Sequence, residues 1–216
     1  GTAPYTYVIV SGSLPTGLTM STTGRIGVSG SSTPTITGTF PFSVKVTDAS
    51  GRTDVKNFSL SVDDPLSIST PNLNTGITGQ GYNQTLQATG GYGSYTWSVY
   101  SGTLPQGINL DVSTGVLSGT PQAAATMQLV IMAEDSVGRQ AFKNLTLIVT
   151  APLAFVTSTL PNGARNETYS EQVRVSGGLA PYQFTYTGTL PTGLSLNQTT
   201  CVISGTPTSA MLTNIQ

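Results

Sequence analysis

Few residues in this chain of 216 residues are of a type that performs chemistry. The sequence has no histidine, and its nine acidic side chains are scattered along its length. Histidine is the commonest general base and a frequent ligand of transition metals, so neither kind of site has its usual starting point. The glycines stand at turn spacing and form no phosphate-binding or dinucleotide-binding motif. We therefore expect no enzymatic activity, no catalytic residue and no organic cofactor.

Calcium is the ligand for which the sequence offers the best candidates, because it binds clustered oxygen donors. Asp63 and Asp64 are adjacent carboxylates, and we predict that they are the metal ligands if a calcium site exists. Asp48 and Asp135 stand instead in turn sequences, where an aspartate side chain accepts hydrogen bonds from the main-chain N–H groups that follow it. We expect these two residues to stabilise turns.

Tyr92 is the candidate for a different kind of ligand. It lies in the sequence GGYGSY, off the positions that point inward, so its ring could stack against a sugar. The alternative is that a tyrosine flanked by glycines packs at the end of a β-sandwich. Both interpretations remain open at the level of sequence.

Lysine and cysteine chemistry receives less support. Lys56 and Lys143 are each followed by asparagine, but a Lys–Asn cross-link needs a buried lysine, and we expect both lysines on the solvent side of their strands. Cys201 is the only cysteine, which excludes a disulfide within the chain. Its neighbours Val202 and Ile203 favour a buried thiol over an intermolecular bridge.

Composition indicates the elements that must position these residues. Charged residues make up 8% of the chain and the net charge is −1, so the surface offers no attraction for nucleic acid or anionic lipid. No apolar run approaches the roughly 18–20 residues of a membrane span. Abundant threonine and valine, with frequent glycine and proline, favour strands joined by tight turns. We predict an all-β chain without a membrane span in this segment and without a nucleic-acid partner.

The strongest signal is an internal repeat with a period of about 87 residues. The motif Leu-Pro-x-Gly occurs three times, and other motifs recur in the same order. The matched segments are residues 14–17, 104–107 and 190–193 (Leu-Pro-x-Gly), 118–121 and 204–207 (SGTP), 47–52 and 134–139 (TDASGR and EDSVGR), and 56–62 and 143–149 (KNFSLSV and KNLTLIV).

This period predicts three domains. Residues 65–151 form a complete repeat, residues 1–64 a repeat without its N-terminal strands, and residues 152–216 a repeat without its C-terminal strands. Missing strands would leave sheet edges and a core face exposed. We therefore expect either an excerpt of a longer array or strands supplied by neighbouring, identical chains, so that neighbouring repeats are the main partners.

Alternating apolar residues within the middle repeat predict its strands. At least six short strands separated by glycine and proline turns, in fewer than about 90 residues, are typical of an immunoglobulin-like β-sandwich. Trp97 is the largest side chain available for the core. In Leu-Pro-x-Gly the proline presets φ for a turn that the glycine completes with positive φ, so we interpret the motif as backbone architecture and not as a site of chemistry.

The segments SGTLPQGINL (101–110) and TGVLSGTP (114–121), followed by an Asp-x-x-Gly turn, resemble the immunoglobulin-like repeats called He-PIG. These repeats are relatives of cadherin-like modules and occur in tandem in large prokaryotic surface proteins. The resemblance covers essentially the whole chain. It implies tandem immunoglobulin-like β-sandwich repeats in a non-enzymatic structural segment of a long extracellular surface protein, stalk or filament.

The same resemblance leaves two alternatives for function. One is an adhesin or carbohydrate-binding module, with glycans or other surface proteins as partners, and the other is an accessory domain of a secreted hydrolase. Cadherin-like modules place calcium at the joints between repeats, where Asp63 and Asp64 lie. The second joint, residues 150–153 (TAPL), has no carboxylate, which counts against an ion at every joint.

Overall fold

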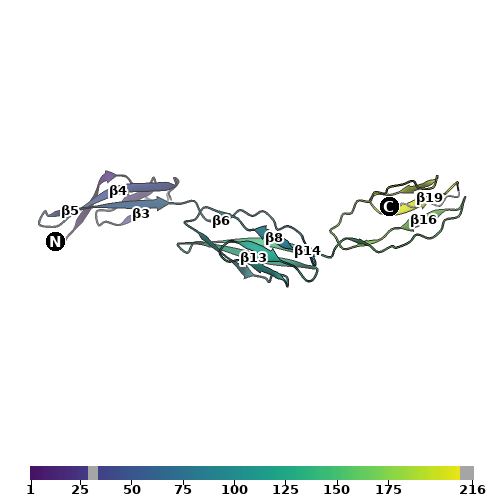
Figure 1. Ribbon diagram of the computed structural model, residues 1–216. Helices are drawn as coiled ribbons and strands as arrows, with labels where there is room; N and C mark the ends of the chain where they lie inside the picture. The colour runs from purple at the N-terminus through teal and green to yellow at the C-terminus, as the bar shows by residue number, and fades with distance from the viewer. Residues whose placement is uncertain (29–33, 210–216) are drawn as a thin grey trace. The chain divides into compact units, whose positions relative to one another are not determined.

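The computed structural model describes residues 1–28 and 34–209. All regular secondary structure in these ranges is β-strand (Figure 1). Accordingly, no helix within the described ranges is long and apolar enough to span a membrane. The all-β prediction is confirmed. The chain divides into two compact units, whose bounds differ from those of the sequence repeats. One unit comprises residues 1–69, 88–95 and 133–141, and the other comprises residues 70–87, 96–132 and 142–216.

The middle repeat forms two main sheets and one short strand pair. One sheet has the order β10-β13-β14-β7 and the other the order β11-β12-β8, while β6 pairs with β9. The strands are β6 (Ser67–Ile68), β7 (Gly76–Ile77), β8 (Tyr82–Thr85), β9 (Ala88–Thr89), β10 (Tyr95–Ser101), β11 (Ile108–Leu110), β12 (Val116–Gly119), β13 (Ala125–Asp135) and β14 (Gln140–Thr150).

The core of this repeat consists of the alternating residues that the sequence singles out. Leu117, Ile131 and Leu147 are fully buried, and Trp97 is 3% exposed. Alternate side chains of a strand point to the same face of a sheet, so period-two apolar patterning places them all inside. The middle repeat therefore has a closed hydrophobic core.

In the part of the chain that the structure describes, the other two repeats contain fewer strands than the middle one. In the first repeat β1-β4-β5 form one sheet and β2-β3 a second, and in the third repeat β16-β19-β18 and β15-β17 form the sheets. The strands are β1 (Thr6–Gly12), β2 (Leu18–Met20), β3 (Ile26–Val28), β4 (Gly38–Thr47), β5 (Thr53–Val62), β15 (Ala154–Phe155), β16 (Tyr169–Gln172), β17 (Val175–Ser176), β18 (Leu194–Leu196) and β19 (Val202–Gly205).

The Leu-Pro-x-Gly motif packs its backbone against the SGTP motif of the same repeat. Gly107 has φ +92°, and its carbonyl oxygen accepts a hydrogen bond from the Thr120 N–H at 2.9 Å. A Cβ atom added to Gly107 would overlap the Thr120 carbonyl oxygen. The third repeat reproduces this contact, with Gly193 at φ +96° bonded to Thr206 at 3.1 Å. The two motifs recur together because each fits the backbone of the other.

Candidate functional site

The buried carboxylate of Asp135 organises the loop that follows β13. Its Oδ1 accepts hydrogen bonds from the N–H groups of Val137 (3.0 Å) and Arg139 (2.9 Å). Its Oδ2 accepts from the Tyr92 N–H (2.9 Å) and from Arg139 Nε (2.7 Å). The side chain is fully buried, so four donors replace the water that an ionised carboxylate would otherwise require. The predicted turn role of Asp135 is confirmed.

Asp48 holds the equivalent loop of the first repeat in the same way. Its Oδ1 accepts from the N–H groups of Ser50 and Arg52, both at 2.9 Å. Its Oδ2 accepts from the Thr2 N–H at 3.1 Å and from Arg52 Nε at 3.0 Å. The two loops are therefore copies of one hydrogen-bonded unit.

The hydrogen bonds around Asp135 decide its protonation state. Burial of the carboxyl acts to raise its pKa, but the main-chain and side-chain bonds from Arg139, with those from Tyr92 and Val137, outweigh burial and lower the pKa to about 2. A carboxylate with so low a pKa is a weak base at neutral pH. Asp135 is thus suited to holding a loop and unsuited to proton transfer.

Arg139 connects this loop to the first joint of the chain. Its Nη2 donates to Asp63 Oδ2 at 3.1 Å, while its Nε donates to Asp135. The guanidinium therefore lies between two carboxylates, and both raise its pKa. Asp63 Oδ1 also accepts from the Ser61 hydroxyl at 3.1 Å.

Asp64 takes part in the joint through its main chain. Its carbonyl oxygen accepts a hydrogen bond from the Gly91 N–H at 2.8 Å. At the second joint the Ala151 carbonyl oxygen accepts from the Gly178 N–H, also at 2.8 Å. This contact does not depend on a carboxylate, which explains why alanine can occupy the equivalent position.

The structure brings the three predicted site residues Asp63, Asp64 and Tyr92 to one place, around the loop of Asp135. Asp63 contributes a carboxylate, whereas Asp64 and Tyr92 contribute main-chain groups. Within residues 1–28 and 34–209, no three His, Cys, Asp or Glu side chains lie close enough together to hold a metal ion. Asp63 and Asp64 stay the predicted ligands if a calcium ion binds, and such an ion would compete with Arg139 for Asp63.

This competition gives a direct test. Because the Arg139 guanidinium already supplies positive charge to Asp63, we expect the melting temperature of the chain to be the same in excess calcium chloride and in excess EDTA. Differential scanning calorimetry measures it, with magnesium chloride at equal ionic strength as the control. A rise in melting temperature specific to calcium would show that the ion displaces the arginine.

The Tyr92 ring lies at the surface while its backbone is fixed. The side chain is 51% exposed. Its carbonyl oxygen accepts hydrogen bonds from the Ser136 N–H (3.1 Å) and the Ser136 hydroxyl (2.6 Å). The ring is therefore presented on an ordered loop, and its role in ligand binding stays a prediction.

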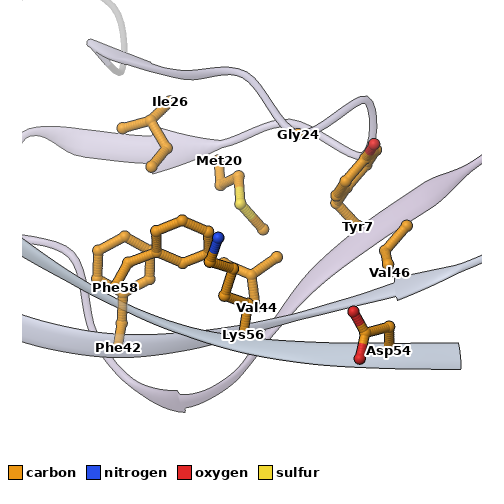
Figure 2. A pocket seen from close by; sticks show the side chains of 10 residues that line it. All are labelled: Tyr7, Met20, Gly24, Ile26, Phe42, Val44, Val46, Asp54, Lys56 and Phe58. Carbon is orange, nitrogen blue, oxygen red and sulfur yellow. The ribbon is translucent and has the colours of Figure 1, made fainter.

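The two lysines lie on the other face of their strands than expected, but Lys56 is exposed to solvent, as predicted, and Lys143 is half-buried. Lys56 has the same parity as Phe58 on β5 and lines an open cavity, with its Nζ 5.8 Å from the centre of the Phe58 ring (Figure 2). Lys143 likewise shares its parity with the buried Leu145 on β14. The alternation that places leucines inside continues through the lysines toward the strand ends.

The cavity that Lys56 lines is the open core of the first repeat. It has a volume of about 340 Å³. Phe42, Val44, Phe58 and Ile26 contribute apolar walls from β3, β4 and β5 (Figure 2). Sequence reasoning predicts an exposed core face in this repeat but does not locate it.

Cys201 is 4% exposed, which confirms the prediction of a buried thiol. It has φ +54° and occupies the position at which the other repeats have Gly24 and Gly115, both with positive φ. Burial raises the pKa of the Cys201 thiol. The thiolate, the reactive form, is therefore disfavoured as well as shielded.

We expect native Cys201 to react with the disulfide reagent DTNB roughly 100-fold more slowly than the same thiol in guanidinium chloride, because reaction must await local opening. Absorbance of the released thionitrobenzoate gives both rates. Equal rates would mean that the thiol is accessible in the folded third repeat.

The He_PIG family, whose description is "Putative Ig domain", matches the chain three times, at residues 1–63, 64–150 and 151–214. This confirms the resemblance inferred from the repeated motifs. No curated protein matches the sequence.

Several solved structures are similar over part of their length. A structure of Drosophila N-cadherin EC1-4 is 15% identical with a TM-score of 0.38, over 93% of this chain and 57% of that chain. A fragment of intimin in complex with the intimin-binding domain of the translocated intimin receptor is 20% identical with a TM-score of 0.42, over 71% and 54%. A putative alpha-galactosidase from Bacteroides fragilis is 23% identical with a TM-score of 0.35, over 42% and 19%. The chain thus spans about a fifth of the galactosidase and little more than half of the other two.

Proposed function

The chain belongs to the He_PIG family of immunoglobulin-like domains, and from this premise we propose that it is a non-enzymatic structural segment of a long extracellular surface protein. In this proposal the protein is a stalk or filament built from tandem repeats. Its partners are neighbouring repeats of the same chain or of identical chains.

One observation carries this proposal: the chain repeats a complete unit of architecture. The packing of Leu-Pro-x-Gly against SGTP recurs in the middle and third repeats, and the aspartate-centred loop recurs in the first and middle repeats. A polypeptide that repeats one fold gains length in constant increments, because each unit contacts chiefly its neighbours. Length is then the property that the repetition serves.

The joints support a mechanical role. At each joint a main-chain carbonyl oxygen accepts a hydrogen bond from the N–H of the second glycine of a Gly-Gly pair. Asp64 accepts it from Gly91 at one joint, and Ala151 accepts it from Gly178 at the other. A proline follows at each joint, and proline restricts the conformation of the residue before it. In the proposed function these short, ordered joints limit bending between repeats.

Localisation on the source cells tests the proposal. Antibodies raised against the chain are expected to label intact cells, and immunogold particles are expected to lie at a constant distance from the envelope. An antibody against a cytoplasmic protein is the control for cell integrity. Labelling that requires permeabilised cells would contradict an extracellular stalk or filament.

Exposure of Tyr92 favours carbohydrate binding as a second candidate function. Its ring stands out from an ordered loop, as a platform for a sugar ring requires. If this function is correct, Tyr92→Ala abolishes binding to glycans on an array. Tyr100→Ala is the matched control, since Tyr100 is 66% exposed but packs edge-on against Phe142, with ring centres 4.9 Å apart. An absence of binding by the unmodified chain to a broad array would contradict this candidate.

A further inference from the structure

We propose that Asn197, on the loop between β18 and β19, carries an N-linked oligosaccharide. The inference rests on the proposed function, because this modification is made on proteins that are secreted. Its acceptor motif is Asn-x-Ser/Thr, here called a sequon. The chain contains five sequons, which begin at Asn57, Asn83, Asn144, Asn166 and Asn197.

The position of each sequon in the fold separates the candidates. All five asparagines are exposed, but Asn57, Asn83 and Asn144 lie within β5, β8 and β14. A transferase must draw the acceptor segment into its own site, and a strand residue would have to give up hydrogen bonds of the sheet to enter it. Loop residues do not carry this cost, which leaves Asn166 and Asn197.

The loop of Asn197 fixes the acceptor side chain in one orientation. Its Oδ1 accepts hydrogen bonds from the N–H groups of Thr199 and Thr200, both at 3.0 Å. The main chain is held as well, since the Asn197 N–H donates to the Val202 carbonyl oxygen at 2.9 Å and the Asn197 carbonyl oxygen accepts from the Cys201 N–H at 2.8 Å. The oxygen end of the carboxamide is thus turned into the loop, and the Nδ2 end is the one offered to a reagent.

These two N–H donors suit the chemistry of the transfer. Nδ2 forms a bond to the anomeric carbon of an oligosaccharide carried on a lipid diphosphate. The bond from that carbon to the diphosphate oxygen breaks, the diphosphate leaves with the electron pair, and the Nδ2 proton passes to a base of the transferase. Resonance makes an amide nitrogen a weak nucleophile. As its proton leaves, negative charge develops on Oδ1, where the N–H groups of Thr199 and Thr200 stabilise it as an oxyanion hole would.

The middle repeat shows that this loop does not need an asparagine in order to fold. Asp111 occupies the equivalent position, is exposed, and accepts from the N–H groups of Ser113 and Thr114 at Oδ1, both at 2.9 Å. A carboxylate keeps the turn but has no nitrogen that could bond to a sugar. Asparagine and aspartate are therefore equivalent here for structure and different for glycosylation, which makes Asn197→Asp a clean test.

Mass spectrometry of the chain purified from its source cells tests the proposal. Trypsin cuts after Arg165 and Arg174, so the peptide that begins at Val175 contains Asn197 as its only sequon up to residue 216. Residues 166–174 form a separate peptide that reports on Asn166. We expect the peptide that begins at Val175 to carry the mass of an oligosaccharide, and electron-transfer fragmentation to place it on Asn197.

Variants expressed in the same cells separate the sequon from the turn. Asn197→Asp and Thr199→Ala are each expected to lose the oligosaccharide completely, whereas Thr199→Ser is expected to keep it. Thr200→Ala is the matched control: the Thr200 N–H also donates to Asn197, but its hydroxyl lies outside the motif, so this variant is expected to stay modified. Circular dichroism verifies that all four variants are folded.

An unmodified Asn197 in the source protein would overturn the proposal, and so would a sugar that persists in Asn197→Asp, which would be linked to a hydroxyl group. Loss of the sugar in Thr200→Ala would equally contradict a role for the sequon. Antibody labelling of intact cells reports separately on the proposed function. Labelled cells with an unmodified peptide would overturn the glycan alone, whereas a glycan on a chain that is not labelled at the surface would support this inference and contradict the stalk or filament.

Discussion

Gly107→Ala is expected to lower the free energy of unfolding of the middle repeat by about 2–4 kcal/mol, because the substitution combines backbone strain with a steric overlap. Gly107 has φ +92°, a conformation that L-residues adopt at a cost of about 1 kcal/mol or more. The added Cβ atom would also overlap the Thr120 carbonyl oxygen. Rigid backbone lies on both sides of this contact, so relief requires the two motifs to separate.

A single tryptophan makes this measurement specific. Trp97 is the only tryptophan and lies in the core of the middle repeat, so its fluorescence during denaturation reports on that repeat alone. Gly138→Ala is the matched control: Gly138 has φ +83°, but no atom lies within 4 Å of an added Cβ. We expect this control to lose only about 1 kcal/mol, the strain without the overlap. Equal losses for the two variants would mean that the packing of the motifs contributes nothing.

Local rules explain why much of the fold could be predicted from the sequence. The burial of Trp97 follows from period-two alternation, and the positive φ of Gly107 follows from its place after a proline turn. Each of these inferences uses residues within one strand or one turn. The repeat then multiplies them, because a rule that holds at one copy of a motif holds at the next.

Most contacts of the candidate site could not be predicted from rules that use one strand or one turn. Arg139 reaches Asp63 across 76 positions of sequence, so only the folded chain shows that the arginine lies between two carboxylates. A signal was nevertheless present, since the arginine recurs with its aspartate in TDASGR and EDSVGR. The lysines illustrate a different error: the sequence interpretation put Lys56 on the face opposite its apolar neighbours, whereas the alternation along β5 puts it on the same face as Phe58. Its exposure to solvent agrees with the prediction.

Asp135→Asn is expected to lower the melting temperature of the middle repeat by at least about 5 °C at neutral pH. The carboxylate accepts four hydrogen bonds, two at each oxygen, from three N–H groups of the main chain and from Arg139 Nε. An amide offers one acceptor oxygen and turns an NH₂ group toward two of these donors. Buried donors then lose their partners, and the Arg139 guanidinium loses one of its two counter-charges.

The pH dependence gives the same prediction an independent readout. The Asp135 pKa of about 2 in the folded chain lies below its ordinary value of 3.8. Protonation therefore favours unfolding, so the stabilisation is fully present above about pH 4 and is lost as the pH falls toward 2. In the Asp135→Asn variant this part of the acid sensitivity, followed by Trp97 fluorescence, is expected to disappear.

Asp111→Asn is the matched control, because Asp111 also has its pKa lowered to about 2, by hydrogen bonds from the Thr114 N–H and the Ser113 hydroxyl. The third repeat shows what asparagine does at this position: Asn197 Oδ1 accepts from the N–H groups of Thr199 and Thr200, both at 3.0 Å. We therefore expect Asp111→Asn to keep the neutral-pH melting temperature of the original chain. If Asp135→Asn were equally tolerated, the buried loop would be no more than a surface turn, and Arg139 would have no structural reason to span the two carboxylates.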